Sequence, residues 1–152
     1  MSTIVCLHAH PDDESSSTGG TIARAVADKA GRKVIVAGSV GPTGELFEPL
    51  GALTHEEAVD SFAEQIRGLK AGGIDVVWIE TMSAPEEMQT ASEAAIRENM
   101  PFVFTASFDT AGKTMMGTHP RDIHKVAEPL AVKPFAIGAN CGVGASDILA
   151  SL

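Results

Sequence analysis

The sequence is poor in cysteine, has no long apolar stretch and carries no excess of basic residues. Two cysteines in 152 residues exclude a disulfide framework as the main source of stability. No stretch approaches the length of a membrane-spanning helix. The first residues show neither a basic segment nor a cleavage site. We therefore expect a cytoplasmic protein without a membrane partner.

The charge balance is acidic. Eleven Lys and Arg residues stand against 20 Asp and Glu residues, which gives a formal net charge of −9 at pH 7. Nucleic acids and anionic membrane surfaces repel a domain of this charge, so neither is expected as a partner. The hydrophobic fraction of 44% is enough for a buried core. The length suits a single domain over residues 1–152.

Five short apolar runs alternate with helical patterns. The runs are Thr3–His8, Lys33–Val40, Asp75–Met82, Phe102–Phe108 and Phe135–Cys141. Their nearly continuous hydrophobicity is typical of strands that are covered on both faces. The alternation predicts an α/β domain with a five-stranded parallel sheet of βα units.

Two arrangements of such a sheet are open. We expect a Rossmann-like or flavodoxin-like three-layer arrangement, with helices on both faces of the sheet. The alternative is a half TIM barrel with consecutive strand order. That order would leave one sheet face uncovered, and a homodimer would then be expected.

Start signals mark the predicted helices. Thr54 and Glu57 form a capping box, and an apolar stripe at helical spacing follows them. Ser83 and Glu86 predict a second capping box, with Pro85 in the first turn. A further helix is predicted to begin at about Pro120.

A polar motif, HAHPDDE over residues 8–14, follows the first predicted strand. In an open parallel sheet, ligands bind at this edge. One imidazole and two carboxylates can hold a divalent metal ion and activate its water. Composition alone favours a simpler interpretation, a polar loop with a capping aspartate.

The motif and the Thr-Gly-Gly helix start after it closely resemble the LmbE-like (PIG-L) de-N-acetylase family over residues 3–27. The resemblance implies a Rossmann-like zinc hydrolase that removes acetyl groups from N-acetylglucosamine conjugates. On this resemblance His10 and Asp13 match the first two zinc ligands, and Asp12 matches the general base.

The third zinc ligand of that family is a histidine much later in the chain. The candidates here are His119 and His124, which lie in one short polar stretch. We favour an ordinary polar helix start for both.

Polar residues also end two later apolar runs, namely Glu80, Asn140 and Cys141. The carboxyl ends of parallel strands share one edge, so these side chains should lie near one another. A thiolate there could bind zinc, and a carboxylate could receive a substrate ammonium group. Yet Cys141, like Cys6, lies in an apolar run, and on that ground alone both thiols are expected to be buried and reduced.

The order and spacing of these residues, with the Gly-rich turn at 36–45, closely resemble the homocysteine S-methyltransferase family from about residue 25 to residue 152. The resemblance implies a TIM barrel that transfers a methyl group to homocysteine held as a zinc thiolate, and the chain is similar to its third to sixth strands. Glu80 and Asn140 match positions that contact the amino acid. Cys141 matches the first zinc cysteine. The opening Asp-Gly-Gly strand, the adjacent cysteine pair and strands seven and eight of that family are missing.

We therefore interpret the chain as an engineered chimera, with a natural fusion or truncation as the alternative origin. Residues 1–27 form its deacetylase-like βα unit and residues 28–152 its methyltransferase-like part. We expect a scaffold with no complete active site and no efficient native activity. A zinc-dependent de-N-acetylase-like hydrolase and a remnant homocysteine S-methyltransferase are the alternatives. No cofactor is expected, and zinc at His10 and Asp13 should bind weakly.

Overall fold

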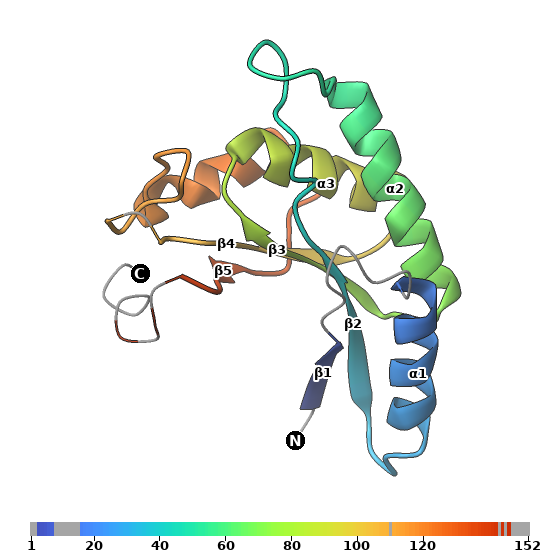
Figure 1. Cartoon of the computed structure of the whole chain (residues 1–152). Coiled ribbons are helices and arrows are strands. Elements are labelled where there is room, and N and C mark those ends of the chain that lie inside the picture. The colour runs from blue at the N-terminus through green and yellow to red at the C-terminus, as the bar shows by residue number, and fades with distance from the viewer. Residues whose placement is uncertain (1–2, 8–15, 110, 143, 145, 147–152) are drawn as a thin grey trace.

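The computed structural model describes residues 3–7, 16–109, 111–142, 144 and 146. They form a regular alternation of strands and helices (Figure 1). The strands are β1 Thr3–Leu7, β2 Val34–Val40, β3 Val76–Met82, β4 Phe102–Ala106 and β5 Ile137–Ala139. The helices are α1 Ser16–Asp28, α2 His55–Ala71, α3 Pro85–Arg97 and the 3₁₀ helix η1 Pro120–Ala127.

The strands form one sheet in the order β1-β2-β3-β4-β5, and every neighbouring pair is parallel. This confirms the predicted parallel α/β sheet. The consecutive order is that of a TIM-barrel fragment, so the half-barrel alternative holds. The three-layer arrangement is wrong, because a doubly wound sheet reverses its strand order at a switch point and this sheet does not.

The helices of the described chain lie along one side of the sheet (Figure 1). On β3, Val77 and Ile79 are fully buried under the helices, whereas Val76 and Trp78 on the other face are partly exposed. We call this second face the open face and define it by the partly exposed side chains of Ile35, Val76, Trp78, Val103 and Ile137. The main hydrophobic core lies between the sheet and the helices.

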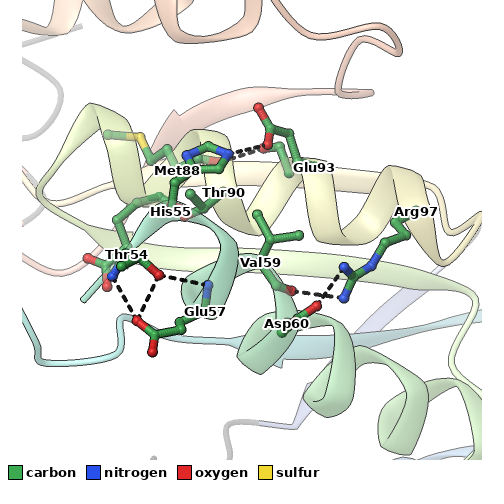
Figure 2. Close-up of polar contacts among 11 residues, drawn as sticks. Thr54, His55, Glu57, Val59, Asp60, Met88, Thr90, Glu93 and Arg97 are labelled. Atoms are coloured by element: carbon green, nitrogen blue, oxygen red, sulfur yellow. Dashed lines mark hydrogen bonds and ion pairs between the residues drawn. The ribbon is translucent and has the colours of Figure 1, made fainter. Parts of the chain in front are cut away.

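Helix α2 begins as the sequence predicts. The Thr54 hydroxyl accepts a hydrogen bond from the Glu57 N–H at 3.3 Å, and the Thr54 N–H donates to the Glu57 carboxylate at 3.0 Å (Figure 2). The apolar stripe then packs against the sheet and the neighbouring helices, with Phe62, Ile66 and Leu69 buried. The first capping box is therefore confirmed.

Helix α3 begins one residue later than predicted. Its N-cap is Ala84, which has no side chain to bond the first turn, so the second capping box is wrong. Pro85 lies in the first turn, as expected, and is the first helical residue. The carboxylate of Glu87 instead accepts hydrogen bonds of 2.7 Å from both the N–H and the hydroxyl of Thr43. These bonds tie the loop after β2 to the start of α3.

The helix at Pro120 is a 3₁₀ helix, and it buries Ile123, Val126 and Ala127. In the described part of the chain, no helix is both long and apolar enough to cross a membrane.

Candidate functional site

Side chains from three strands meet at the carboxyl edge of the sheet. They are Ser39 of β2, Glu80 and Thr81 of β3, and Asn140 and Cys141 directly after β5. We call these five residues the edge cluster. The sequence placed Glu80, Asn140 and Cys141 at this edge, and the structure brings all three together.

A β-bulge in β3 shapes the cluster. Ile79 pairs with Phe104 and Met82 with Ala106, so β3 carries one extra residue between these two pairs. Thr81 lies in the bulge with φ of 59°, in the left-handed region that β-branched residues rarely adopt. In this conformation both the N–H and the hydroxyl of Thr81 form hydrogen bonds with the side chain of Asn140.

Asn140 links the cluster together. Its Oδ1 accepts a hydrogen bond from the Thr81 N–H at 2.9 Å. Its Nδ2 donates to the Thr81 hydroxyl at 2.7 Å and to Glu80 Oε2 at 3.2 Å. Since a side-chain amide has one acceptor and two donor hydrogens, nearly all of its capacity is used here. The other carboxylate oxygen of Glu80 accepts from the Ser39 hydroxyl, so two neutral donors orient the Glu80 carboxylate.

Cys141 has an exposed thiol. The expectation of a buried thiol is wrong for this residue, because β5 ends at Ala139 and Cys141 lies in the following turn with φ of 58°. Its Sγ is 3.5 Å from the Thr81 hydroxyl and 3.5 Å from Asn140 Nδ2. The side chain of Cys6 lies outside the described residues.

The described side chains around Cys141 do not supply a zinc site. Catalytic zinc sites supply three protein ligands, usually from Cys, His, Asp or Glu. The Cys141 thiol lies against the Thr81 hydroxyl and the Asn140 amide. Among the residues that the structure describes, no three Cys, His, Asp or Glu side chains gather in a way that could hold a metal ion.

The deacetylase-like candidates His10, Asp12 and Asp13 lie outside the described residues. Of the two later histidines, His119 is the N-cap residue of η1. His124 is exposed within η1, and its Nε2 is 3.9 Å from the Glu128 carboxylate. His119 thus lies at the helix start, as expected, whereas His124 lies in the last turn of η1, so that expectation is wrong for His124.

Two members of the edge cluster, Ser39 and Thr81, were not singled out from the sequence. The signal for Ser39 was present, because it is a polar residue inside the apolar strand β2. Alternation along β2 places it on the open face, opposite the buried Val40. Thr81 could not be found in this way, because its role depends on the bulge.

Comparison with known proteins supports both resemblances. The homocysteine S-methyltransferase family model matches residues 7–152. Methionine synthase from Mycobacterium tuberculosis (strain ATCC 25618 / H37Rv) is 30% identical over 142 residues, which cover 88% of this chain and 12% of that protein. A 1D-myo-inositol 2-acetamido-2-deoxy-alpha-D-glucopyranoside deacetylase from Mycobacteroides abscessus is 41% identical over 69 residues, which cover 45% of this chain and 23% of that protein.

The fold also matches a solved structure. The homocysteine methyltransferase MmuM from Escherichia coli, in its apo form, superposes with a TM-score of 0.72 at 20% identity. The match covers 99% of this chain and 59% of that chain. This likeness establishes the fold of a barrel fragment.

Both alignments extend beyond the residues whose motifs carry the resemblances. The methyltransferase family match reaches back to residue 7, and the deacetylase alignment is 69 residues long. The methionine synthase alignment covers 88% of this chain and the deacetylase alignment covers 45% of it. The two shares add up to more than the whole chain, so the alignments have residues in common. The findings are therefore compatible with a chimera, but the similarities meet in an overlap and not at a sharp boundary.

Proposed function

Because the chain belongs to the homocysteine S-methyltransferase family and also matches deacetylases over part of its length, we propose that it is a chimera with a partial amino-acid site and no efficient activity. The observation that carries this proposal is the edge cluster. There Glu80 and Asn140, the two residues that resemble amino-acid contacts, are hydrogen-bonded to each other.

An α-amino acid suits the charge and shape of this cluster. The Glu80 carboxylate is held by hydrogen bonds from Ser39 and Asn140, so it offers an ammonium group a charged acceptor of fixed orientation. Orientation of this kind lowers the cost of binding, because the protein side chain is already ordered. The site lies at the carboxyl edge of a parallel sheet, where such folds bind their ligands.

Efficient methyl transfer needs more than the described edge cluster supplies. Homocysteine reacts as a thiolate, and a thiolate requires a positive group or a metal ion to lower the thiol pKa. The donors described around Cys141 do not form a metal site. The chain also spans only 59% of the solved methyltransferase. We propose that the amino acid binds weakly and that its sulfur is not activated.

Titration with L-homocysteine, followed by ligand-observed NMR, tests this proposal. We expect weak binding that falls about tenfold or more in Glu80→Gln, which removes the negative charge. Glu45→Gln is the matched control, since Glu45 is an exposed carboxylate in the loop after β2. Equal binding by the parent and Glu80→Gln would disprove the amino-acid site.

An assay of homocysteine methylation tests the second half of the proposal. Turnover should be undetectable in the parent protein. A rate that exceeds that of Cys141→Ala would show that the thiol does support the reaction, and the chain would then be a working methyltransferase.

A zinc-dependent de-N-acetylase is the second candidate, favoured by the 41% identity to the M. abscessus deacetylase. In this proposal His10 and Asp13 would hold the metal ion and Asp12 would act as general base, and all three lie outside the described residues. Release of acetate from an N-acetylglucosamine conjugate, lost in Asp12→Ala, would support it.

A further inference from the structure

The open face of the sheet has properties that the proposed amino-acid site does not explain. We propose that it is the interface of a homodimer, in which two copies pack their open faces together with their strands running in opposite directions.

The open face is apolar and uncovered by the described residues. Two cavities lie along it, one of about 330 Å³ against Trp78 and Ile137 and one of about 510 Å³ against Ile35 and Phe135. They adjoin each other, because Val76 and Val103 line both. Phe135 is 80% exposed at one end. Parallel sheets are almost always covered on both faces, so this face requires an occupant.

The distribution of charge favours a second copy as that occupant. Basic side chains gather at the amino edge of the sheet, in or beside the segments that lead into strands: Lys29, Arg32, Lys33 and Lys70, whereas Arg97 is ion-paired with Asp60 of α2 at 2.7 Å. Asp28, Asp75 and Glu98 offset part of this charge. Acidic side chains outnumber basic ones at the carboxyl edge, in or beside the segments that follow strands: Glu45, Glu48, Glu86 and Asp109 stand against Lys113.

The relative orientation of the two copies follows from this charge pattern. When two copies meet with antiparallel strands, the basic edge of each faces the acidic edge of the other. A two-fold axis generates this contact from one surface, and it closes after two copies. With parallel strands, edges of like charge would meet instead.

The open face is large enough for a stable dimer only if the loops at its edges also take part in the interface. The strands have five, seven, seven, five and three residues; at about 3.3 Å per residue and about 4.8 Å between strands they project an area of roughly 430 Å². A stable interface buries about 800 Å² on each partner. Phe135 and the charged loops at both edges would supply the remainder, which is consistent with the high exposure of Phe135.

Sedimentation of the purified chain over a dilution series tests the proposal. We expect a dimer whose dissociation constant rises about tenfold or more in Val103→Asp, because the variant places an unpaired charge in an apolar interface. Val26→Asp is the matched control, since Val26 is 57% exposed on α1, away from the open face. A dimer that both variants leave unchanged would place the interface elsewhere and overturn the proposal.

A second measurement needs no variant and so does not depend on whether Val103→Asp folds. Trp78 is the single tryptophan of the chain and lies on the open face, where its Nε1–H donates to the Thr105 hydroxyl at 3.3 Å. Its fluorescence should shift to longer wavelength as dilution separates the copies. A monomer at every concentration, with constant emission, would overturn the dimer. A dimer that salt does not weaken would overturn the antiparallel orientation.

Discussion

At the scale of single residues, Gly38 shows how closely β2 approaches α2. A Cβ atom at this position would lie 2.8 Å from Cδ1 of Ile74 and 3.2 Å from Cδ1 of Leu69. We predict that Gly38→Ala lowers the free energy of unfolding by about 1–3 kcal/mol through overpacking. Urea denaturation measures this. Gly41→Ala is the control, because a Cβ there has no neighbour within 4 Å; equal losses in both variants would contradict the explanation.

Asn140 is the residue on which the edge cluster most depends. Asn140→Ala removes the acceptor of the Thr81 N–H and two donors, and the free energy of unfolding should fall by about 1–3 kcal/mol. Thermal denaturation is the measurement. Cys141→Ser, a neighbouring change at an exposed side chain, should stay within about 0.5 kcal/mol of the parent. If Asn140→Ala is as stable as Cys141→Ser, the hydrogen bonds of Asn140 do not contribute to stability, and the prediction is wrong.

The candidate site was predictable from sequence where strand ends define it. Glu80, Asn140 and Cys141 follow from the ends of two apolar runs, and they do lie together. The exposure of Cys141 did not follow, since the hydrophobic run continues past the last residue that pairs with β4. Likewise, nothing in the composition of β3 reveals the bulge that turns Thr81 toward Asn140.

At the scale of elements, the first turn of α2 couples stability to pH. Hydrogen bonds from the Thr54 hydroxyl and N–H to the carboxylate lower the pKa of Glu57. Their contribution to stability is therefore complete above the ordinary pKa of a glutamate. It is lost as the pH falls through the lowered pKa of the folded state.

We predict that Thr54→Ala lowers the free energy of unfolding by about 0.5–2 kcal/mol at neutral pH, as loss of an N-cap usually does. The difference from the parent should narrow in acid, once Glu57 is protonated. Urea denaturation at neutral and acid pH measures both effects. Glu64→Ala, an exposed change on the same helix, should have little effect at either pH. A difference that is constant with pH would exclude the Glu57 carboxylate as the cause.

Elements with strong local signals were predicted most closely. Helix α2 combines a capping box with a regular apolar stripe and begins directly after Thr54, as expected. The start of α3 was misplaced by one residue because Ser83 and Glu86 have the right spacing, yet Glu87 binds the loop after β2. The sequence predicted the last strand over Phe135–Cys141. In the structure β5 covers only Ile137–Ala139, because only these three residues pair with β4.

At the scale of the whole molecule, the strand order could not be predicted from the hydrophobic pattern. The inner face of a TIM barrel is packed with side chains, as is the second face of a three-layer sheet. Both folds therefore require apolar residues on both faces of each strand. Val76 and Val103 fit either arrangement, and only the structure shows that the described residues leave them uncovered.

Metal binding provides a whole-molecule prediction. We expect zinc titration by calorimetry to show weak binding at best, because His10 and Asp13 supply two ligands and the described donors near Cys141 form no metal site. His119→Ala should leave the zinc affinity unchanged, since we interpret His119 as the N-cap residue of η1 and not as a zinc ligand. Tight stoichiometric binding that is lost in both His10→Ala and His119→Ala would instead establish a three-ligand site and support the deacetylase.

The consecutive strand order also bears on how the chain folds. Each strand pairs with the next one along the sequence, and the main helix contacts are α1 with α2, α2 with α3, and α3 with η1. Structure can therefore grow unit by unit from the amino terminus during synthesis, as in repeat proteins. Amide hydrogen exchange should consequently be slowest in the inner strands β2, β3 and β4, which have neighbours on both sides, and should be faster in the edge strands β1 and β5, where opening breaks only one set of contacts.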